Sequence, residues 1–189
     1  MASPRRLIVG LSGASGTVYG LAILRALRAA EVETHLIVSE GARRTMEIET
    51  AVSFGEVAAL ASVLHDVHDL AASISSGSFR TDGMVVAPCS IKSAASIAHG
   101  LNGDLLTRAA DVCLKERRRL VLVVRETPLH LGHLRTLTQL AEIGAVILPP
   151  IPAMYAKPQT IDDIVAHTAG KVLDQFGIEH ALFQRWVGA

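Results

Sequence analysis

The sequence is short of aromatic residues and cysteines, has no excess of either charge, and contains no long hydrophobic run. Phe, Trp and Tyr make up 4% of its 189 residues, although half of the chain is hydrophobic. Small aliphatic side chains dominate that half, which favours helices packed closely on a parallel sheet. The 18 Lys and Arg residues balance 18 Asp and Glu residues. A net basic stripe, as nucleic-acid-binding proteins carry, is therefore not expected.

The apolar runs are also too short for a membrane span. The longest cover 84–87 and 120–124, which is strand length and far below the roughly 18 residues that a spanning helix needs. The apolar segment after the two N-terminal arginines is too short for a signal-peptide core. The surplus apolar surface therefore predicts a subunit interface. Cys89 and Cys113 lack disulfide or metal-ligand spacing, so we expect a cytoplasmic location.

Strand and helix patterns alternate along the whole chain. Short buried strands are expected at 6–11, 34–38, 83–87, 120–124 and 145–148, and helices at 17–30, 41–50, 54–60, 90–99, 105–115, 130–143 and 160–177. The segment 66–80, rich in Ser, Ala and Gly, is expected to form a loop over a site. Because no repeat or linker divides the chain, we expect a single domain over 1–189 that is built on a doubly wound α/β sheet.

Polar residues follow several of the predicted strands. Ligands of open parallel sheets bind outside the carboxyl ends of the strands, so side chains at those ends should converge on one site. The candidates from this rule are Ser12, Ser15, Ser39, Ser90, Arg125, Glu126 and, slightly further along, Tyr155.

The segment GLSGASG, residues 10–16, is the strongest local motif. Gly13 and Gly16 let the backbone approach an anion at the start of the next helix, and Ser12 and Ser15 could bond a phosphate or a ring nitrogen. The motif is neither a P-loop nor the GxGxxG fingerprint, because its glycines follow GxxGxxG. Glu40 could bind a nicotinamide ribose, although Ser39 occupies the strand end. A tight turn without a ligand is the alternative.

Basic residues gather in the second half of the chain. Arg108 and Lys115 are seven residues apart on one helical face, and Arg125 and Glu126 end the next strand. Three cations beside one carboxylate would neutralise a phosphorylated substrate without a metal ion, and the carboxylate could transfer a proton. For the cluster at 115–119, a solvated helix end is the alternative interpretation.

A metal site or a cysteine nucleophile is not expected. His130 and His133 share a helix face without a neighbouring acidic or cysteine cluster. Asp162 and Asp163 follow Thr160 in a helix's first turn, where capping explains them. Cys89 has no base beside it and is interpreted as a small buried residue.

Taken together and in order, the segments GLSGASG, PCSIKS, LLTRAADVCLKERR, VVRETPLHLGHL and PPIPAMYAKPQTIDDIV resemble the flavin prenyltransferase (UbiX-like) family. The resemblance runs from Leu7 to about Trp186. It implies a flavodoxin-like, Rossmann-type fold and a homododecamer with sites at subunit interfaces. It further implies transfer of a dimethylallyl group from dimethylallyl monophosphate to N5 and C6 of reduced FMN. The product, prenylated FMN, would serve a UbiD-like decarboxylase partner.

The resemblance also assigns residues. Those implied for FMN binding are Gly13, Ala14, Ser15, Ser39, Ser90, Ile91, Lys92, Ser93 and Arg125. Those implied for the substrate phosphate are Arg108, Lys115, Arg125, Tyr155 and Lys171. Catalytic roles fall on Glu126, which would protonate the leaving phosphate and later help to remove the C6 proton, on Ser15 with Glu49 behind it near flavin N5, and on Lys115.

Two departures from the family pattern concern the substrate. Lys171 stands where relatives carry arginine, which keeps the charge but loses bidentate geometry. The segment Ser73–Phe79 has no tryptophan to stack on the allyl group, so either Phe79 or another residue serves, or no residue stacks there.

Two other functions fit the same fold. A flavin-dependent decarboxylase that oxidises a peptidyl cysteine would need a histidine near the flavin. A non-catalytic FMN carrier would need no second phosphate site, so Arg108, Lys115, Tyr155 and Lys171 argue against it.

Overall fold

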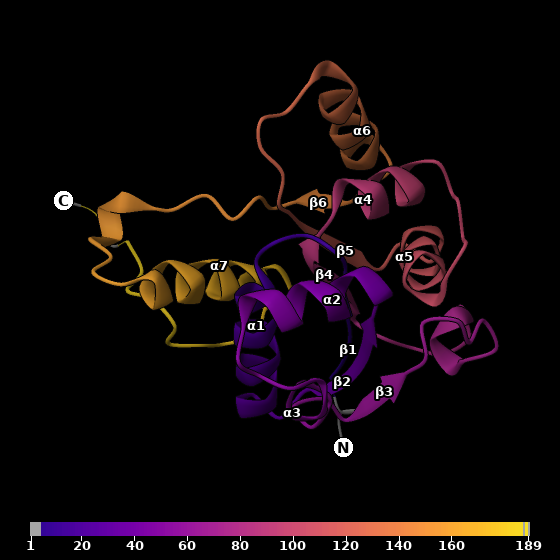
Figure 1. The fold of residues 1–189 in the computed structure, drawn as a ribbon, viewed down its shortest axis with the longest axis horizontal. Coiled ribbons are helices and arrows are strands. Elements are labelled where there is room, and N and C mark those ends of the chain that lie inside the picture. The colour runs from indigo at the N-terminus through magenta and orange to yellow at the C-terminus, as the bar shows by residue number, and fades with distance from the viewer. Residues whose placement is uncertain (1–4, 187, 189) are drawn as a thin grey trace.

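The computed structural model describes residues 5–186 and 188, which are built around one parallel sheet (Figure 1). Its six strands are β1 (Arg6–Leu11), β2 (Glu33–Val38), β3 (Val63–His65), β4 (Gly83–Cys89), β5 (Arg119–Val124) and β6 (Val146–Ile147). They lie in the order β3-β2-β1-β4-β5-β6. The chain winds outward from β1 to one edge and then from β4 to the other. The predicted doubly wound sheet is confirmed, with its reversal of direction between β1 and β4.

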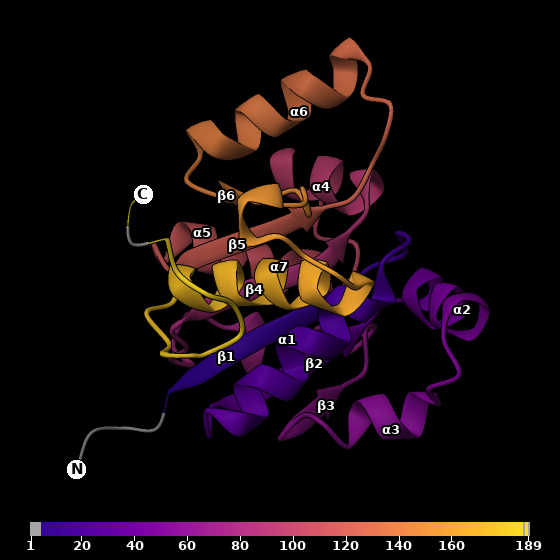
Figure 2. The same ribbon diagram turned by 90° about the vertical axis from the view of Figure 1, so that its left-hand side faces the viewer.

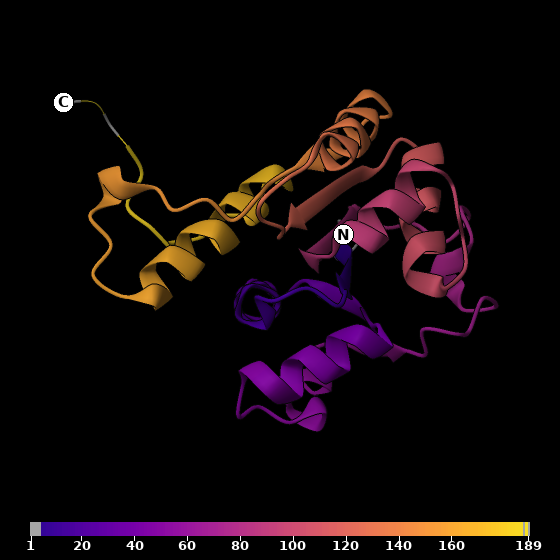
Figure 3. The ribbon, with the colours of Figure 1, turned by 45° about the horizontal axis from the view of Figure 1, so that its top comes forward.

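Helices cover both faces of the sheet (Figure 2). One layer contains α1 (Thr17–Ala29), α2 (Glu40–Glu49), α3 (Phe54–Ala58) and α7 (Ile161–Gln175), and the other contains α4 (Ile91–Ala98), α5 (Leu105–Lys115) and α6 (Leu131–Glu142). Short 3-10 turns lie at η1 (Ser73–Ser75) and η2 (Met154–Ala156). The segment after β6 carries η2 away from the sheet, on the side away from α4 and α5 (Figures 1 and 3).

The strands are apolar without interruption because both of their faces are covered. In β5, Val121 and Val123 pack toward the layer of α1 and α7, whereas Leu120 and Leu122 pack toward the layer of α4 and α5. All four side chains are fully buried. Among residues 5–186 and 188, no helix combines the length and the hydrophobicity needed to cross a bilayer.

The sequence-based assignment missed β3. This strand has three residues at the edge of the sheet, and its Val63 and Leu64 are exposed. A strand so short and so exposed has no buried periodicity from which it could be recognised.

The segment 66–80 only partly covers a site. Val67 and His68 border a cleft at the carboxyl edge of the sheet. The later part of the segment instead packs on α5, where Arg108 Nε donates to the Ser75 carbonyl at 3.1 Å.

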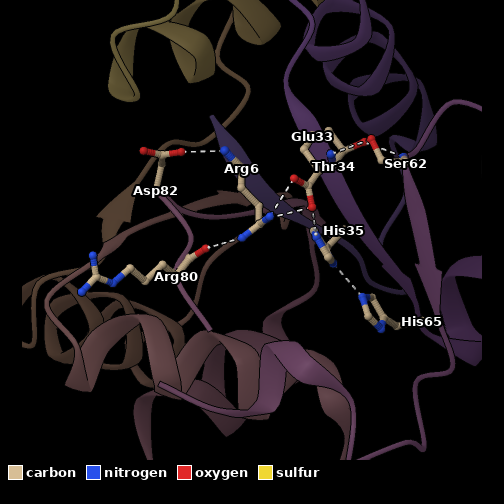
Figure 4. A network of polar contacts seen from close by, with 8 residues as sticks. All are labelled: Arg6, Glu33, Thr34, His35, Ser62, His65, Arg80 and Asp82. Carbon is tan, nitrogen blue, oxygen red and sulfur yellow. Dashed lines mark hydrogen bonds and ion pairs between the residues drawn. The ribbon is translucent and has the colours of Figure 1, made fainter. Parts of the chain in front are cut away.

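A polar network joins β1, β2 and β3 toward the amino ends of the strands (Figure 4). Arg6 binds both carboxylate oxygens of Glu33, at 2.7 and 2.8 Å, and this contact lowers the pKa of Glu33. The ring of His35 joins Glu33 at 2.9 Å to His65 at 2.8 Å. Phe79 packs edge-on against His35 and beneath the Arg6 guanidinium. Phe79 therefore packs within this network, and it lines neither of the two clefts described below.

Candidate active site

A cleft of about 600 Å³ lies at the carboxyl edge of the sheet, across the reversal between β1 and β4. Its walls come from the segments that follow β1, β2, β4 and β5, as expected from the rule for strand ends. The residues expected to bind FMN all line it: Gly13, Ala14, Ser15, Ser39, Ser90, Ile91, Lys92, Ser93 and Arg125. Glu126 lines it as well. Its volume lies within the usual range for small-molecule sites.

Two helices begin at this cleft with serine caps. Ser39 accepts the Ala42 N–H at 3.1 Å, and Ser90 accepts the Ser93 N–H at 3.2 Å. A helix start presents unpaired N–H groups and the positive end of the helix dipole, and both favour an anion. The exposed Lys92 adds a positive charge in the first turn of α4. This end of the cleft therefore fits the phosphate of a flavin mononucleotide.

The glycine-rich turn needs its glycines because two backbones meet there. A Cβ on Gly13 would lie 3.0 Å from the Gly41 backbone, and Gly16 has a φ of 111°. That φ favours glycine because other residues rarely adopt it. The turn therefore brings main chain, rather than side chains, to the cleft wall.

A second cleft of about 560 Å³ adjoins the first. Ser15, Arg125 and Glu126 line both of them. The rest of its lining is mainly apolar, with side chains from the start of α1 and from the segments after β5 and β6: Val18, Tyr19, Val124, Leu129, Pro149, Pro150 and Ile151. The site thus offers one polar and one apolar compartment, with a cation and a carboxylate between them.

Arg125 and Glu126, which line both clefts, are positioned by backbone hydrogen bonds at the end of β5. Arg125 N–H donates to the Cys89 carbonyl at 3.1 Å, which extends the contact of β5 with β4. Glu126 Oε1 accepts the Thr127 N–H at 2.9 Å. Both side chains are half-buried. A carboxylate held at the boundary of the two compartments can exchange a proton with a ligand in either.

Glu49 lies behind the glycine-rich turn. Its carboxylate accepts the Gly16 N–H at 2.9 Å and the Thr17 N–H at 3.0 Å at the start of α1. Burial raises the pKa of Glu49, but hydrogen bonds from the Ser15 hydroxyl and from these amides outweigh it, so the pKa is lowered. Glu49 is thus held ionised behind Ser15, as an orienting partner of that hydroxyl would be.

The remaining predicted substrate residues do not gather at either cleft. Arg108 pairs with Asp111 at 3.1 Å and Lys115 pairs with Glu116, both on α5. At the other side of the molecule, the Tyr155 hydroxyl lies 3.2 Å from His167, and Lys171 Nζ lies 3.7 Å from Asp174. The expected cluster of Arg108, Lys115 and Arg125 around Glu126 therefore does not form within one chain.

Sequence reasoning also missed residues that border the clefts. His68, Asp104 and Thr107 line the first cleft, and Tyr19 lines the second. His68 follows β3, so recognition of that strand would have pointed to it. Tyr19 lies in the first turn of α1, directly after the glycine-rich turn, and this position was the signal available for it.

Two other assignments from the sequence, those of Cys89 and Asp163, agree with the structure. Cys89 is fully buried, and burial raises its pKa to about 12, so it is a poor nucleophile. Asp163 accepts the Gln159 and Thr160 N–H groups, each at 2.9 Å, which is a capping role. In the part of the chain that the structure describes, no three His, Cys, Asp or Glu residues gather as metal ligands would.

Comparisons with known proteins agree with this geometry. The family model described as Flavoprotein matches residues 1–173. The chain is 61% identical over 188 residues to the flavin prenyltransferase UbiX of Escherichia coli K12, covering 98% of this chain and all of that protein. A crystal structure of AnUbiX (PadA1) in complex with FMN and dimethylallyl pyrophosphate is 48% identical and covers 99% of this chain and 100% of the other, with a TM-score of 0.97. A dodecameric FMN-dependent UbiX-like decarboxylase from E. coli O157:H7 is 53% identical, covers 97% and 100%, and has a TM-score of 0.94.

Proposed function

Because the chain belongs to the UbiX flavin prenyltransferase family, we propose that its first cleft binds reduced FMN and its second binds a dimethylallyl phosphate. The protein is an enzyme that transfers a prenyl group to FMN. We assign residues 1–189 to one FMN-binding domain. The observation that carries the proposal is the pair of adjoining clefts with Ser15, Arg125 and Glu126 in common.

The residues that line each cleft suggest a role for each of them. The start of α4 and Lys92 would bind the flavin phosphate, and Arg125 would neutralise the phosphate of the donor. When bound, reduced FMN supplies the electron-rich ring that accepts the allyl group at N5 and C6. Glu126 would donate a proton to the phosphate oxygen as the carbon–oxygen bond breaks. The apolar second cleft would exclude water from the electron-poor allyl carbon.

We propose the monophosphate as the donor. Enzymes that cleave allylic diphosphates commonly use acidic clusters that hold magnesium against the diphosphate. Over residues 5–186 and 188 no such cluster is found, and the cationic side chain that lines the second cleft is that of Arg125. Dimethylallyl diphosphate is therefore expected to react more slowly.

The decisive test is anaerobic incubation of the purified protein with reduced FMN and dimethylallyl monophosphate, followed by mass spectrometry of the flavin. We expect a flavin heavier by one five-carbon allyl unit, together with free phosphate. A parallel reaction with the diphosphate measures donor preference. Unmodified flavin after many equivalents of intact monophosphate would contradict the proposed function, and it would leave a non-catalytic FMN carrier as the explanation. The alternative function, a flavin-dependent cysteine decarboxylase, is tested by assaying the protein with a peptide that ends in cysteine.

We further propose that the site is completed between subunits of a homododecamer. Arg108 and Lys115 lie on α5, whereas Tyr155 and Lys171 lie on the side of the molecule that carries η2 and α7 (Figure 1). One chain cannot bring them to one phosphate, but neighbouring chains could. Large apolar side chains stand exposed as a subunit interface requires, including Ile151 at 72% and Ile161 at 76% exposure.

Mixed oligomers test this arrangement. We expect Lys115→Ala and Glu126→Gln proteins each to be strongly impaired alone and to regain part of the activity when co-expressed. Random mixing would pair an intact Lys115 with an intact Glu126 at roughly a quarter of the sites, since each site draws the two residues from different chains. The control is co-expression of Glu126→Gln with Arg125→Ala, which lies beside it in the same chain. If Lys115→Ala complements no better than Arg125→Ala, sharing of the site between subunits is wrong.

The product's destination and the compartment are also proposals. Prenylated FMN would pass to a UbiD-like decarboxylase, as the resemblance of this chain to the family implies. A cytoplasmic location is supported by Cys89 and Cys113, which are both buried as free thiols.

A further inference from the structure

Ser12 belongs to the same glycine-rich turn as Ser15, but it is used differently. Its side chain is 1% exposed and does not line either cleft. Its Oγ donates to the Pro88 carbonyl at 3.1 Å and accepts the Ser90 N–H at 2.7 Å. The expectation that this hydroxyl bonds a phosphate or a ring nitrogen is therefore wrong.

The hydroxyl of Ser12 has no donor left for a ligand. A serine hydroxyl carries one hydrogen, and here that hydrogen is directed to Pro88. The Ser12 N–H donates to the same carbonyl at 3.1 Å. One residue thus makes three hydrogen bonds to the segment 88–90.

These three hydrogen bonds connect β1 and β4 beyond the point where their regular strand pairing ends. The pairing of β1 with β4 stops at Gly10 and Val86, and the register of β4 against β5 shifts between Val86 and Cys89. Beyond that point the Ser90 N–H has no strand partner on the β1 side, and it instead donates to Ser12 Oγ. The side chain of Ser12 therefore continues the contact between the ends of β1 and β4.

We infer that Ser12 is a positioning residue for the flavin. Its hydroxyl sets the separation between the Gly13–Ser15 turn and the start of α4 at Ser90–Ser93, and both segments line the first cleft. The inference rests on the proposed function in that FMN binds in this cleft. Ser15 lines both clefts, but the group that loses its partner is the Ser90 N–H, and Ser90–Ser93 line the first cleft and not the second. Loss of the hydroxyl should therefore weaken flavin binding while the allyl donor is bound as before.

Thr and Val substitutions at position 12 form a matched pair. The two side chains have nearly the same size and shape, and valine carries a methyl group where threonine carries the hydroxyl. We expect Ser12→Thr to bind FMN like the unaltered protein, and Ser12→Val to bind it about tenfold more weakly, because the Ser90 N–H is left without an acceptor. In turnover assays, Ser12→Val should raise the KM for reduced FMN by a similar factor and change the KM for dimethylallyl monophosphate less than about twofold.

Each outcome is decisive. Titration of the unaltered protein with FMN comes first, since failure there would reject the proposed function rather than the role of Ser12. If that protein binds FMN but the Thr and Val variants have equal affinity, or if both KM values rise together, the positioning role is rejected. Ser12→Ala, which adds no volume, replaces the Val variant if the latter is insoluble. If neither folds while Ser12→Thr does, the hydroxyl serves the fold and not the flavin, and the inference is likewise rejected.

Discussion

Glu126→Gln is expected to bind FMN with unchanged affinity and to release phosphate from dimethylallyl monophosphate at least about ten- to a hundredfold more slowly. Glutamine keeps the shape of the side chain and its acceptor for the Thr127 N–H. It cannot donate a proton of comparable acidity to a departing phosphate oxygen. Binding and chemistry should therefore separate in this variant.

Single-turnover measurements check this prediction most directly. Enzyme is preloaded with reduced FMN under anaerobic conditions and mixed with the donor, and phosphate release and flavin mass are followed together. Glu142→Gln, at the exposed C-terminal end of α6, provides the control for the loss of one carboxylate elsewhere. Phosphate release at the rate of the unaltered protein would remove Glu126 from the mechanism. Loss of FMN binding in proportion to the rate would instead make Glu126 a flavin-binding residue.

Gly20→Ala is expected to lower the free energy of unfolding by about 2–3 kcal/mol, as overpacking of a well-packed interior does. Gly20 lies where α1 crosses β4. A Cβ there would stand 2.4 Å from the Ala87 carbonyl oxygen and 3.2 Å from Leu11 Cγ. The first contact is with backbone, which cannot move aside without shifting the segment that leads into Ser90. FMN affinity should therefore fall together with stability.

The same substitution at Gly55 should act in the opposite direction. Gly55 lies in α3, and a Cβ there would meet nothing within 4 Å. Alanine restricts the unfolded chain more than glycine does, so Gly55→Ala should stabilise by about 0.5–1 kcal/mol. Thermal midpoints of both variants are compared at equal protein concentration, because association shifts apparent stability. A Gly20→Ala protein as stable as the unaltered one would mean that α1 can move away from β4 at little cost.

Recognition of the fold from sequence succeeded where periodicity was complete. The apolar runs of β4 and β5 and the capped helices around them were predicted within a few residues. β3 was missed because an exposed edge strand of three residues has no hydrophobic period. The rule that ligands bind at strand ends found Ser15, Ser39, Ser90, Arg125 and Glu126. It misassigned Ser12, because sequence does not distinguish a serine that faces a cleft from one that joins two strands.

The sequence by itself determined which residues could carry charge and hydrogen bonds at the carboxyl edge, since the order of strands and turns follows from local pattern. It also determined the family, because the segments LKERR and RETPL occur in the chain in the order that is typical of that family. Only the tertiary structure decided which of those residues meet. Convergence depends on the parallel pairing of β1 with β4 and of β4 with β5. This pairing brings Ser15 and Glu126, which lie far apart in the sequence, to the same two clefts. Arg108 on α5 and Lys171 on α7 do not converge within one chain, because these two helices pack on opposite faces of the sheet. Contacts of this range are set by packing, and no local stretch of sequence encodes them.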